Sequence, residues 1–225
     1  MRRQKRSGAM MVMPSNHSAP WVHYWSGHRP KSVGHLYSPG GHRGPYQWLP
    51  FALDNGAFAG FDESRWRALL RWACLSGYRP LWVAVPDAVG DPGKTSAMWK
   101  QYHGFAQGFG WPLAFVVQDG HRAKDVPAEA KIVFVGGSTD WKRTTAAYWC
   151  EHFPTVHIGR VNTYHWLRYF RDAGATSCDG TGFGRGDKAQ LAGLMRFLKE
   201  THGPPGCLGR GYSVEYLNQW SMSKC

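Results

Sequence analysis

The chain has 225 residues, 43% of them hydrophobic and 15% aromatic, and its 27 Lys and Arg against 15 Asp and Glu give a net charge of +12. This composition excludes an intrinsically disordered chain, because it supplies ample apolar surface for a core, and the length suits one domain. No apolar run reaches the roughly 18 residues that span a bilayer, and the basic N-terminus lacks the apolar stretch of a signal peptide. We therefore expect a soluble, cytoplasmic protein that does not contact membranes.

The excess of positive charge predicts a polyanionic partner, since neutralisation of phosphates dominates the affinity of proteins for nucleic acids. The alternative is a soluble protein that is merely basic. The chain also has five cysteines at irregular spacing, without a CxxC pair or a paired-histidine pattern. We interpret them as reduced thiols and expect no metal site.

The distribution of polar, charged and apolar residues along the chain predicts three segments. Residues 1–20 are polar, basic and aperiodic, which predicts a flexible basic arm. Residues 21–202 alternate short apolar runs with stretches of helical period, which is typical of β/α architecture and indicates one barrel domain. Residues 203–225 begin with a Gly-Pro-Pro-Gly break and are expected to form a C-terminal tail packed on or near the barrel.

Eight apolar runs are candidate strands, the number that a closed barrel needs. They are residues 21–25, 33–37, 50–53, 81–85, 113–117, 132–135, 155–158 and 175–178. The predicted fold is a single α/β domain, a TIM-like (β/α)8 barrel that can be irregular.

Helices are predicted between these runs. The segment after Asp62 places Trp66, Leu69, Leu70 and Ala73 on one helical face. Asp91 is an expected N-cap, followed by a proline at the first helical position, for a helix that carries Met98, Tyr102 and Phe105. Asp187 is expected to begin a helix that buries Leu191, Leu194, Met195 and Leu198.

Polar residues or glycines follow six of the predicted strands. They are Asp54, Asp87, Gln118, the pair Gly136 and Gly137, the pair Gly159 and Arg160, and Asp179. The carboxyl ends of barrel strands converge on one face, and catalytic groups of barrel enzymes lie there. The sequence therefore predicts a site that combines three carboxylates with an amide.

Each of these residues has a simpler interpretation. An aspartate at a strand end is often a turn or helix-capping residue, and we assign Asp91, Asp119 and Asp187 to that group. Asp54, Asp87 and Asp179 differ because the small residues beside them would let a ligand approach the backbone closely.

The glycines and basic residues also have two interpretations each. Gly136, Gly137 and Gly159 are either plain turn residues or sites where a backbone N–H binds the polar edge of a substrate. Arg160 is a surface charge or an anion clamp. The segment 182–188 is either a solvated basic turn or a phosphate contact before a helix, through Arg185 and Lys188.

The ordered series LDNGAF, VPDAVGD, FVVQDG, FVGGSTDW, HIGRVNT and SCDGTGFGRG, within residues 50–198, resembles the tRNA-guanine transglycosylase superfamily. It is most similar to the small, phage-borne DNA 7-deazaguanine transglycosylases. The resemblance implies an irregular barrel that exchanges guanine in a polynucleotide for a 7-deazaguanine base by double displacement.

The resemblance also implies roles for individual residues. Asp179 would be the nucleophile that attacks the sugar C1′, and Asp54 the general acid and base for the departing and incoming bases. Asp87 and Gln118 would bind the guanine edge together with a glycine N–H of Gly136 or Gly137.

These residue types suit the chemistry. A carboxylate stabilises or traps the positive charge that develops on the sugar, and a second acid with a raised pKa protonates the purine. A carboxylate accepts from guanine N1 and N2, whereas an amide or backbone N–H donates to O6, so such a site rejects adenine.

The tRNA enzymes of the family carry a CxCxxC-plus-His zinc module, and the present sequence has no such pattern. We therefore expect DNA and a 7-deazaguanine base such as preQ0 as partners, no cofactor, and the host cytoplasm as location if the gene belongs to a phage. Basic rim and arm residues would hold the DNA backbone. Trp141, Tyr164 and Trp166 are either stacking partners for bases or core residues.

Two alternatives remain open at the level of the sequence. One is a transglycosylase-like subunit that acts on RNA. The other is a barrel that binds nucleic acid without catalysis, although three carboxylates near a polyanion would weaken such binding.

Overall fold

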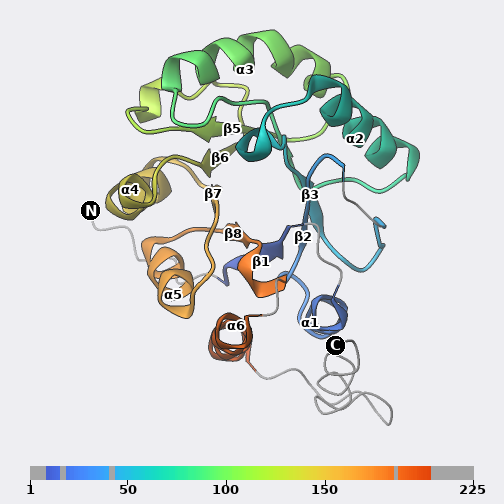
Figure 1. Cartoon of the computed structure of the whole chain (residues 1–225), viewed down its shortest axis with the longest axis vertical. Helices are drawn as coiled ribbons and strands as arrows, with labels where there is room; N and C mark the ends of the chain where they lie inside the picture. Colours follow the sequence, from blue (N-terminus) through green and yellow to red (C-terminus); the bar gives the residue numbers. More distant parts are fainter. Residues whose placement is uncertain (1–8, 16–18, 41–43, 185–186, 204–225) are drawn as a thin grey trace.

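Eight parallel strands surrounded by helices make up the structure, a computed structural model that describes residues 9–15, 19–40, 44–184 and 187–203 (Figure 1). The strands are β1 (Met11–Pro14), β2 (His35–Tyr37), β3 (Phe51–Leu53), β4 (Val83–Ala84), β5 (Leu113–Val117), β6 (Ile132–Val135), β7 (Val156–Ile158) and β8 (Ser177–Gly180). Their order in the sheet is β1-β8-β7-β6-β5-β4-β3-β2, and all neighbours are parallel.

Two parallel bridges between the first two strands close the sheet into a barrel. Val12 pairs with Val33, and Ser15 pairs with Leu36. The backbone N–H of Val12 donates to the Ser32 carbonyl, 3.0 Å away, which supports the same junction. The TIM-like barrel predicted from the alternation of strands and helices is thus confirmed.

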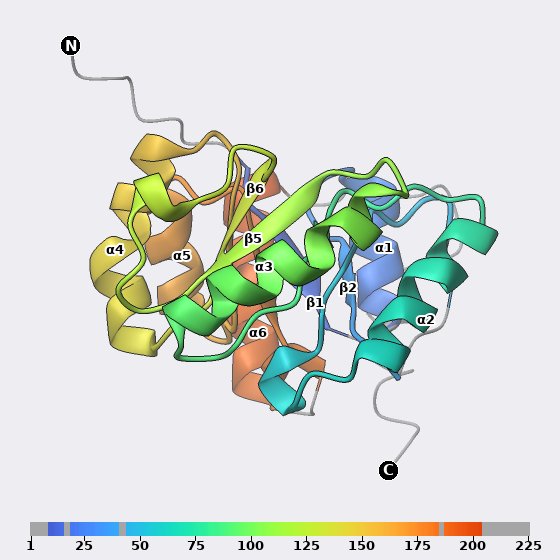
Figure 2. The ribbon, with the colours of Figure 1, turned by 90° about the horizontal axis from the view of Figure 1, so that it is seen from above.

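Six helices of the described chain form the outer ring, which Figure 2 shows from a second direction. They are α1 (Pro20–His28), α2 (Glu63–Leu75), α3 (Pro92–Gln107), α4 (Thr139–His152), α5 (Tyr164–Ala173) and α6 (Lys188–His202). The connection from β5 to β6 contains only a short 3-10 helix, Ala123–Asp125, and the described residues between β2 and β3 contain no α-helix. The barrel is therefore irregular. None of the helices in the described ranges is long and apolar enough to cross a membrane.

Alternate side chains of the strands separate two buried layers. Inside the barrel lie Met11, Met13, Leu36, Ala52, Trp82, Ala84, Ala114, Val116, Ile132 and Phe134. The opposite faces of the strands pack against the helices in a larger core that includes Val12, Leu53, Trp66, Phe115 and Trp149. The inner layer fills the barrel below its carboxyl-terminal end, so the strand ends there form the floor and walls of an open site.

The start of the barrel differs from the sequence prediction in two places. Residues 11–14 were expected to belong to a flexible arm but form β1, because this short, fully buried apolar run fills the place between β2 and β8. Residues 21–25 were expected to form a strand but belong to α1, in which Pro20 stands at the first helical position and Val22, Trp25 and Ser26 are buried at helical spacing. Residues 1–8 and 16–18 of the predicted arm lie outside the described residues, as do residues 204–225 of the predicted tail.

The other seven predicted runs each overlap a strand. Helix α2 buries Trp66, Leu69, Leu70 and Ala73 as predicted. In α3 the buried face is shifted from the predicted one: Tyr102 is buried, but Trp99 replaces Met98 at its centre. In α6, Leu194 and Leu198 are buried as expected, and Phe197 joins them.

Candidate active site

A cavity of about 750 Å³ opens at the carboxyl ends of the strands. Each of the eight strands supplies a lining residue from its end or from the turn that follows. In strand order these residues are Ser15, Ser38, Asp54, Asp87, Gln118, Gly136, Gly159 and Asp179. The volume lies within the range of pockets that hold small organic ligands.

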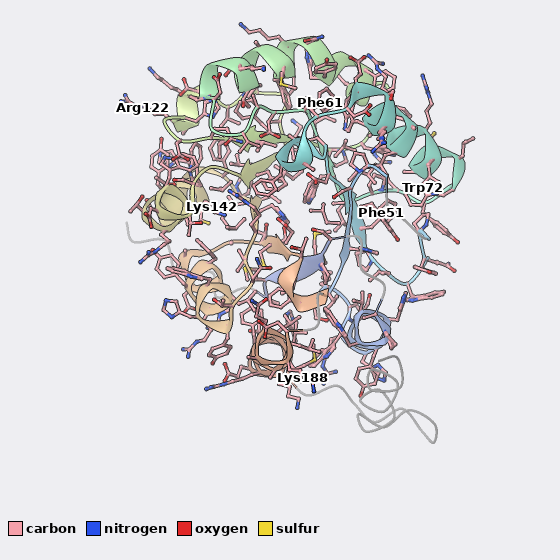
Figure 3. The ribbon with its side chains drawn as sticks, in the orientation of Figure 1. Phe51, Phe61, Trp72, Arg122, Lys142 and Lys188 are labelled. Carbon is pink, nitrogen blue, oxygen red and sulfur yellow. The ribbon has the colours of Figure 1, made fainter. Side chains whose placement is uncertain are left out.

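The cavity brings together eight of the ten residues predicted for the site. Besides the strand-end residues Asp54, Asp87, Gln118, Gly136, Gly159 and Asp179, both Gly137 and Arg160 line it. Lys188 is exposed at the first turn of α6 and is not part of the cavity lining (Figure 3). Arg185 lies outside the described residues.

Two side-chain amides hold the Asp87 carboxylate in place. Asn55 Nδ2 donates to Asp87 Oδ1 at 2.7 Å and to the Val85 carbonyl at 2.9 Å. Gln118 Nε2 donates to Asp87 Oδ2 at 2.6 Å. Each carboxylate oxygen has a further lone pair, so Asp87 keeps acceptor capacity for a ligand in the cavity.

The orientation of the Gln118 amide is set by the donors around its oxygen. Oε1 accepts from the backbone N–H groups of Gly90, at 3.0 Å, and Gly137, at 3.1 Å. Since Oε1 takes both backbone donors, Nε2 must face Asp87, and its second proton remains for an acceptor in the cavity. The amide nitrogen of Gln118 is therefore a hydrogen-bond donor of defined orientation.

Gly136 and Gly137 do not have the role predicted for them, which was to bind a substrate through a backbone N–H. The N–H of Gly136 donates to the Val117 carbonyl and that of Gly137 donates to Gln118, so both groups are occupied rather than free for a substrate edge. A Cβ on Gly136 would lie 2.9 Å from Gln118 Nε2. Glycine at 136 is therefore needed for the close approach of the amide.

Asp179 is fixed through one of its two oxygens. Oδ1 accepts the backbone N–H of Arg160 at 3.1 Å and lies 3.2 Å from His157 Nε2. Among the described residues, the other oxygen, Oδ2, has one long contact, 3.5 Å from Ser15 Oγ. Asp179 lines the cavity although the residue is only 6% exposed, so Oδ2 is the oxygen left for a ligand.

His157 reaches Asp179 from inside the barrel. The imidazole is fully buried and packs edge-on against Trp82 and Phe134. Its Nδ1 lies 2.8 Å from Ser177 Oγ. An ionised Asp179 can only accept, so Nε2 carries a proton, and in the neutral imidazole Nδ1 accepts from the Ser177 hydroxyl.

The carboxylates influence one another electrostatically. Burial, together with the negative charge of Asp179, raises the pKa of Asp54 above its ordinary range, although a 3.0 Å hydrogen bond from Ser38 Oγ acts in the opposite direction. Burial, together with the charge of Asp54, raises the pKa of Asp87 to about 6, although the hydrogen bonds from Asn55 and Gln118 act in the opposite direction. A raised pKa suits a carboxyl group that transfers protons near neutral pH.

Arg160 stands at the rim of the cavity in a left-handed conformation, with φ of 59°. Its guanidinium lies 4.7 Å from the centre of the Phe58 ring and donates to the Gly137 carbonyl. The exposed Phe58 ring also lines the cavity. The positive charge predicted for the rim is therefore present, and it contacts an aromatic face.

The aspartates assigned to capping have that role. Asp91 accepts the N–H of Lys94 at the start of α3, and Asp187 accepts from Ala189 and Gln190 at the start of α6. Asp119 accepts both the N–H and the hydroxyl of Ser138, the N-cap of α4. Of the aromatic residues weighed for stacking, Trp141, Tyr164 and Trp166 are half-buried and pack against the core.

Four polar residues of the site region were missed as site residues by sequence reasoning: Ser38, Asn55, Lys142 and His157. Two of them carried a signal. His157 is the one polar residue of a buried strand. Lys142 precedes the buried Ala146 and Trp149 by four and seven residues, which places a charge on the buried face of a helix. Ser38 and Asn55 follow strand ends but resemble ordinary turn residues.

The described residues contain no group of three His, Cys, Asp or Glu side chains arranged to hold a metal ion. No protein-family model matches the chain, and no curated protein matches it either. The chemistry of the cavity is therefore argued from its own residues.

Proposed function

We propose that the protein is a transglycosylase that exchanges guanine in DNA for a 7-deazaguanine base such as preQ0. The observation that carries the proposal is the cavity in which three carboxylates and an oriented amide meet, with one oxygen of Asp179 fixed and the other left for a ligand. The choice of DNA rests on the ordered motifs described above and on the net charge of +12.

Guanine recognition would use the Asp87 and Gln118 pair. Asp87 accepts from the N1 and N2 protons of guanine, and the second Nε2 proton of Gln118 donates to O6. Adenine has an acceptor at N1, a donor at C6 and no amino group at C2, so it would leave buried polar groups unpaired. A 7-deazaguanine keeps the same edge, so one pocket accepts both the departing and the incoming base.

The exchange would proceed in two displacements. In the first, Asp179 Oδ2 forms a bond to the sugar C1′ as the bond from C1′ to the base breaks, and the Asp54 carboxyl gives its proton to the departing guanine. In the second, the Asp54 carboxylate takes the proton from the incoming base, which bonds to C1′ and releases the Asp179 carboxylate. Asp54 regains the proton that it gave to guanine, and no group changes its oxidation state, so the exchange needs no redox partner.

The remaining groups would support these steps. The Arg160 N–H and His157 stabilise Asp179 as an anion before attack and again when it leaves. The arginine at the rim would pair with a phosphate next to the target nucleotide. A guanine in a duplex must leave the base stack to enter the cavity, at a cost of a few kcal/mol.

Nucleoside analysis tests the proposal directly. The protein is incubated with preQ0 and either DNA or tRNA, and the digested nucleosides are identified by mass spectrometry. We expect the modified nucleoside in DNA, and none from Asp179→Ala. Incorporation into tRNA alone would favour an RNA-directed enzyme, and no incorporation into either by the wild type would favour a non-catalytic binding barrel.

A further inference from the structure

A buried lysine beside the cavity has no role in the mechanism above. Lys142 is 2% exposed, and Figure 3 shows it on the side of α4 that faces the strands. Its ammonium group donates to the Gly159 carbonyl at 2.6 Å. Charged lysines are almost never fully buried unless paired, so this position calls for a specific reason.

The Gly159 carbonyl belongs to the same peptide unit as the Arg160 N–H. That N–H donates to Asp179 Oδ1 at 3.1 Å, on the opposite side of the peptide unit. A buried cation therefore binds the oxygen of one peptide unit while a buried carboxylate binds its N–H. Both contacts align with the peptide dipole, whose oxygen is negative and whose N–H is positive.

We propose that Lys142 is a positioning residue for Asp179 and acts through the peptide unit that joins Gly159 to Arg160. Its part in catalysis rests on the proposed function, whereas its effect on this peptide unit does not. By holding the carbonyl, Lys142 keeps the N–H directed at Oδ1 and leaves Oδ2 to the cavity.

The backbone conformation supports this role. Arg160 has a positive φ of 59°, which is uncommon for residues other than glycine and persists where surrounding contacts hold it. Lys142 provides such a contact from α4, and Asp179 provides another from β8. Without the lysine, one contact fewer would hold Arg160 in this unfavourable backbone conformation.

Electrostatics favour the same interpretation. Burial and the charge of Arg160 together lower the pKa of Lys142 to about 8, although the charges of Asp179 and Asp119 act in the opposite direction. The amine therefore stays mainly protonated at neutral pH. A methionine of similar length would fill the site without the cost of a buried charge, so packing alone does not account for a lysine here.

The Arg160 amide reports the contact without any need for catalysis. We would compare its proton chemical shift and hydrogen exchange by NMR in the wild type, Lys142→Met and Lys142→Gln. In Lys142→Met we expect an upfield shift and exchange at least about tenfold faster, because a free carbonyl lets the peptide unit rotate away from Asp179. An Arg160 amide identical to that of the wild type would overturn the proposal.

Lys142→Gln and a control variant of Arg143 separate this route from general damage. Lys142→Gln keeps a donor for the carbonyl and should retain more protection than Lys142→Met; equal loss in both would contradict transmission through the peptide unit. Arg143→Met removes the next charge of α4, whose guanidinium lies over Trp166 on the outside, and should leave the Arg160 amide unchanged. The same loss in this control would mean that the amide responds to any change in α4.

Exchange kinetics complete the test. Lys142→Met should lower kcat about tenfold or more while KM for the base stays constant, because the lysine acts on Asp179 and not on the base pocket. Unchanged kcat would contradict a role in catalysis. If the wild type shows no exchange but the Arg160 amide responds as expected, the proposed function fails and the assignment of Lys142 to this peptide unit stands.

Discussion

Asp87 illustrates how neighbouring side chains set the chemistry of a single carboxyl group. Asn55 and Gln118 fix its plane with two short hydrogen bonds, while burial raises its pKa to about 6. A carboxyl group with a raised pKa becomes protonated at a higher pH than usual. The acceptor that the proposed guanine site needs for N1 and N2 is therefore lost early on acidification.

We predict that the affinity for guanine falls as the pH drops below about 6, by roughly tenfold per unit at the limit, because only the ionised Asp87 accepts both protons. Calorimetric titration with guanine between about pH 5 and about pH 7.5 measures this. Asp87→Asn should bind weakly across the whole range. Constant affinity of the wild type through this range would show that Asp87 does not bind the base.

Asp54 carries the proposed proton transfer, and its raised pKa fits that task. We expect Asp54→Asn to lower the exchange rate by about a hundredfold to ten-thousandfold, the usual contribution of a positioned acid or base. Binding of guanine should change little. Exchange at the wild-type rate in Asp54→Asn would assign the proton transfer to another group.

At the scale of elements, strand ends and helix starts were predictable because they depend on neighbours in sequence. Asp54, Asp87, Gln118 and Asp179 were found because each lies at the end of an apolar run, and such ends converge in a barrel. The hydrogen bonds that orient Asp87, Gln118 and Asp179 were not predictable, since they join residues 19 to 32 positions apart whose orientation depends on the closed barrel.

The errors at the N-terminus have local causes. The aromatic run in residues 21–25 suits a strand by composition, but packing at helical spacing makes it α1. The short strand β1 follows a basic segment, and its four residues gave too little pattern to outweigh that context. His157 and Lys142 escaped notice because isolated polar residues within elements are usually exposed.

The caps offer a test at this scale. Asp91→Ala should destabilise the protein by about 1 kcal/mol through loss of the bond to the Lys94 N–H, and Asp91→Asn by only a few tenths. Chemical denaturation measures both values, and base exchange by Asp91→Asn should equal that of the wild type. Loss of exchange in this variant would show that a helix-capping aspartate outside the cavity also matters for the reaction.

For the molecule as a whole, the net charge of +12 would favour the association with DNA that the proposed function requires. We predict that the logarithm of the DNA affinity falls linearly with the logarithm of salt concentration, with about 0.9 in slope for each phosphate neutralised. Fluorescence anisotropy with labelled single-stranded DNA gives this slope. An affinity independent of salt would remove DNA as an electrostatic partner.

At the same scale, the barrel explains why residues spread from position 54 to position 179 can share one cavity. Each strand brings its own end to the same rim, and closure between β1 and β2 completes the wall. The alternation of runs predicted this architecture. The shortened connection between β5 and β6 was not evident, because a missing helix has no pattern of its own.

In the proposed reaction, Asp179 bonds covalently to the sugar. Incubation with guanine-containing DNA in the absence of an incoming base, followed by denaturation and mass spectrometry of the proteolysed adduct, tests it most directly. We expect DNA attached to the peptide that contains Asp179, and no adduct with Asp179→Asn. An adduct on a different residue, or base exchange that proceeds without any adduct at Asp179, would contradict it.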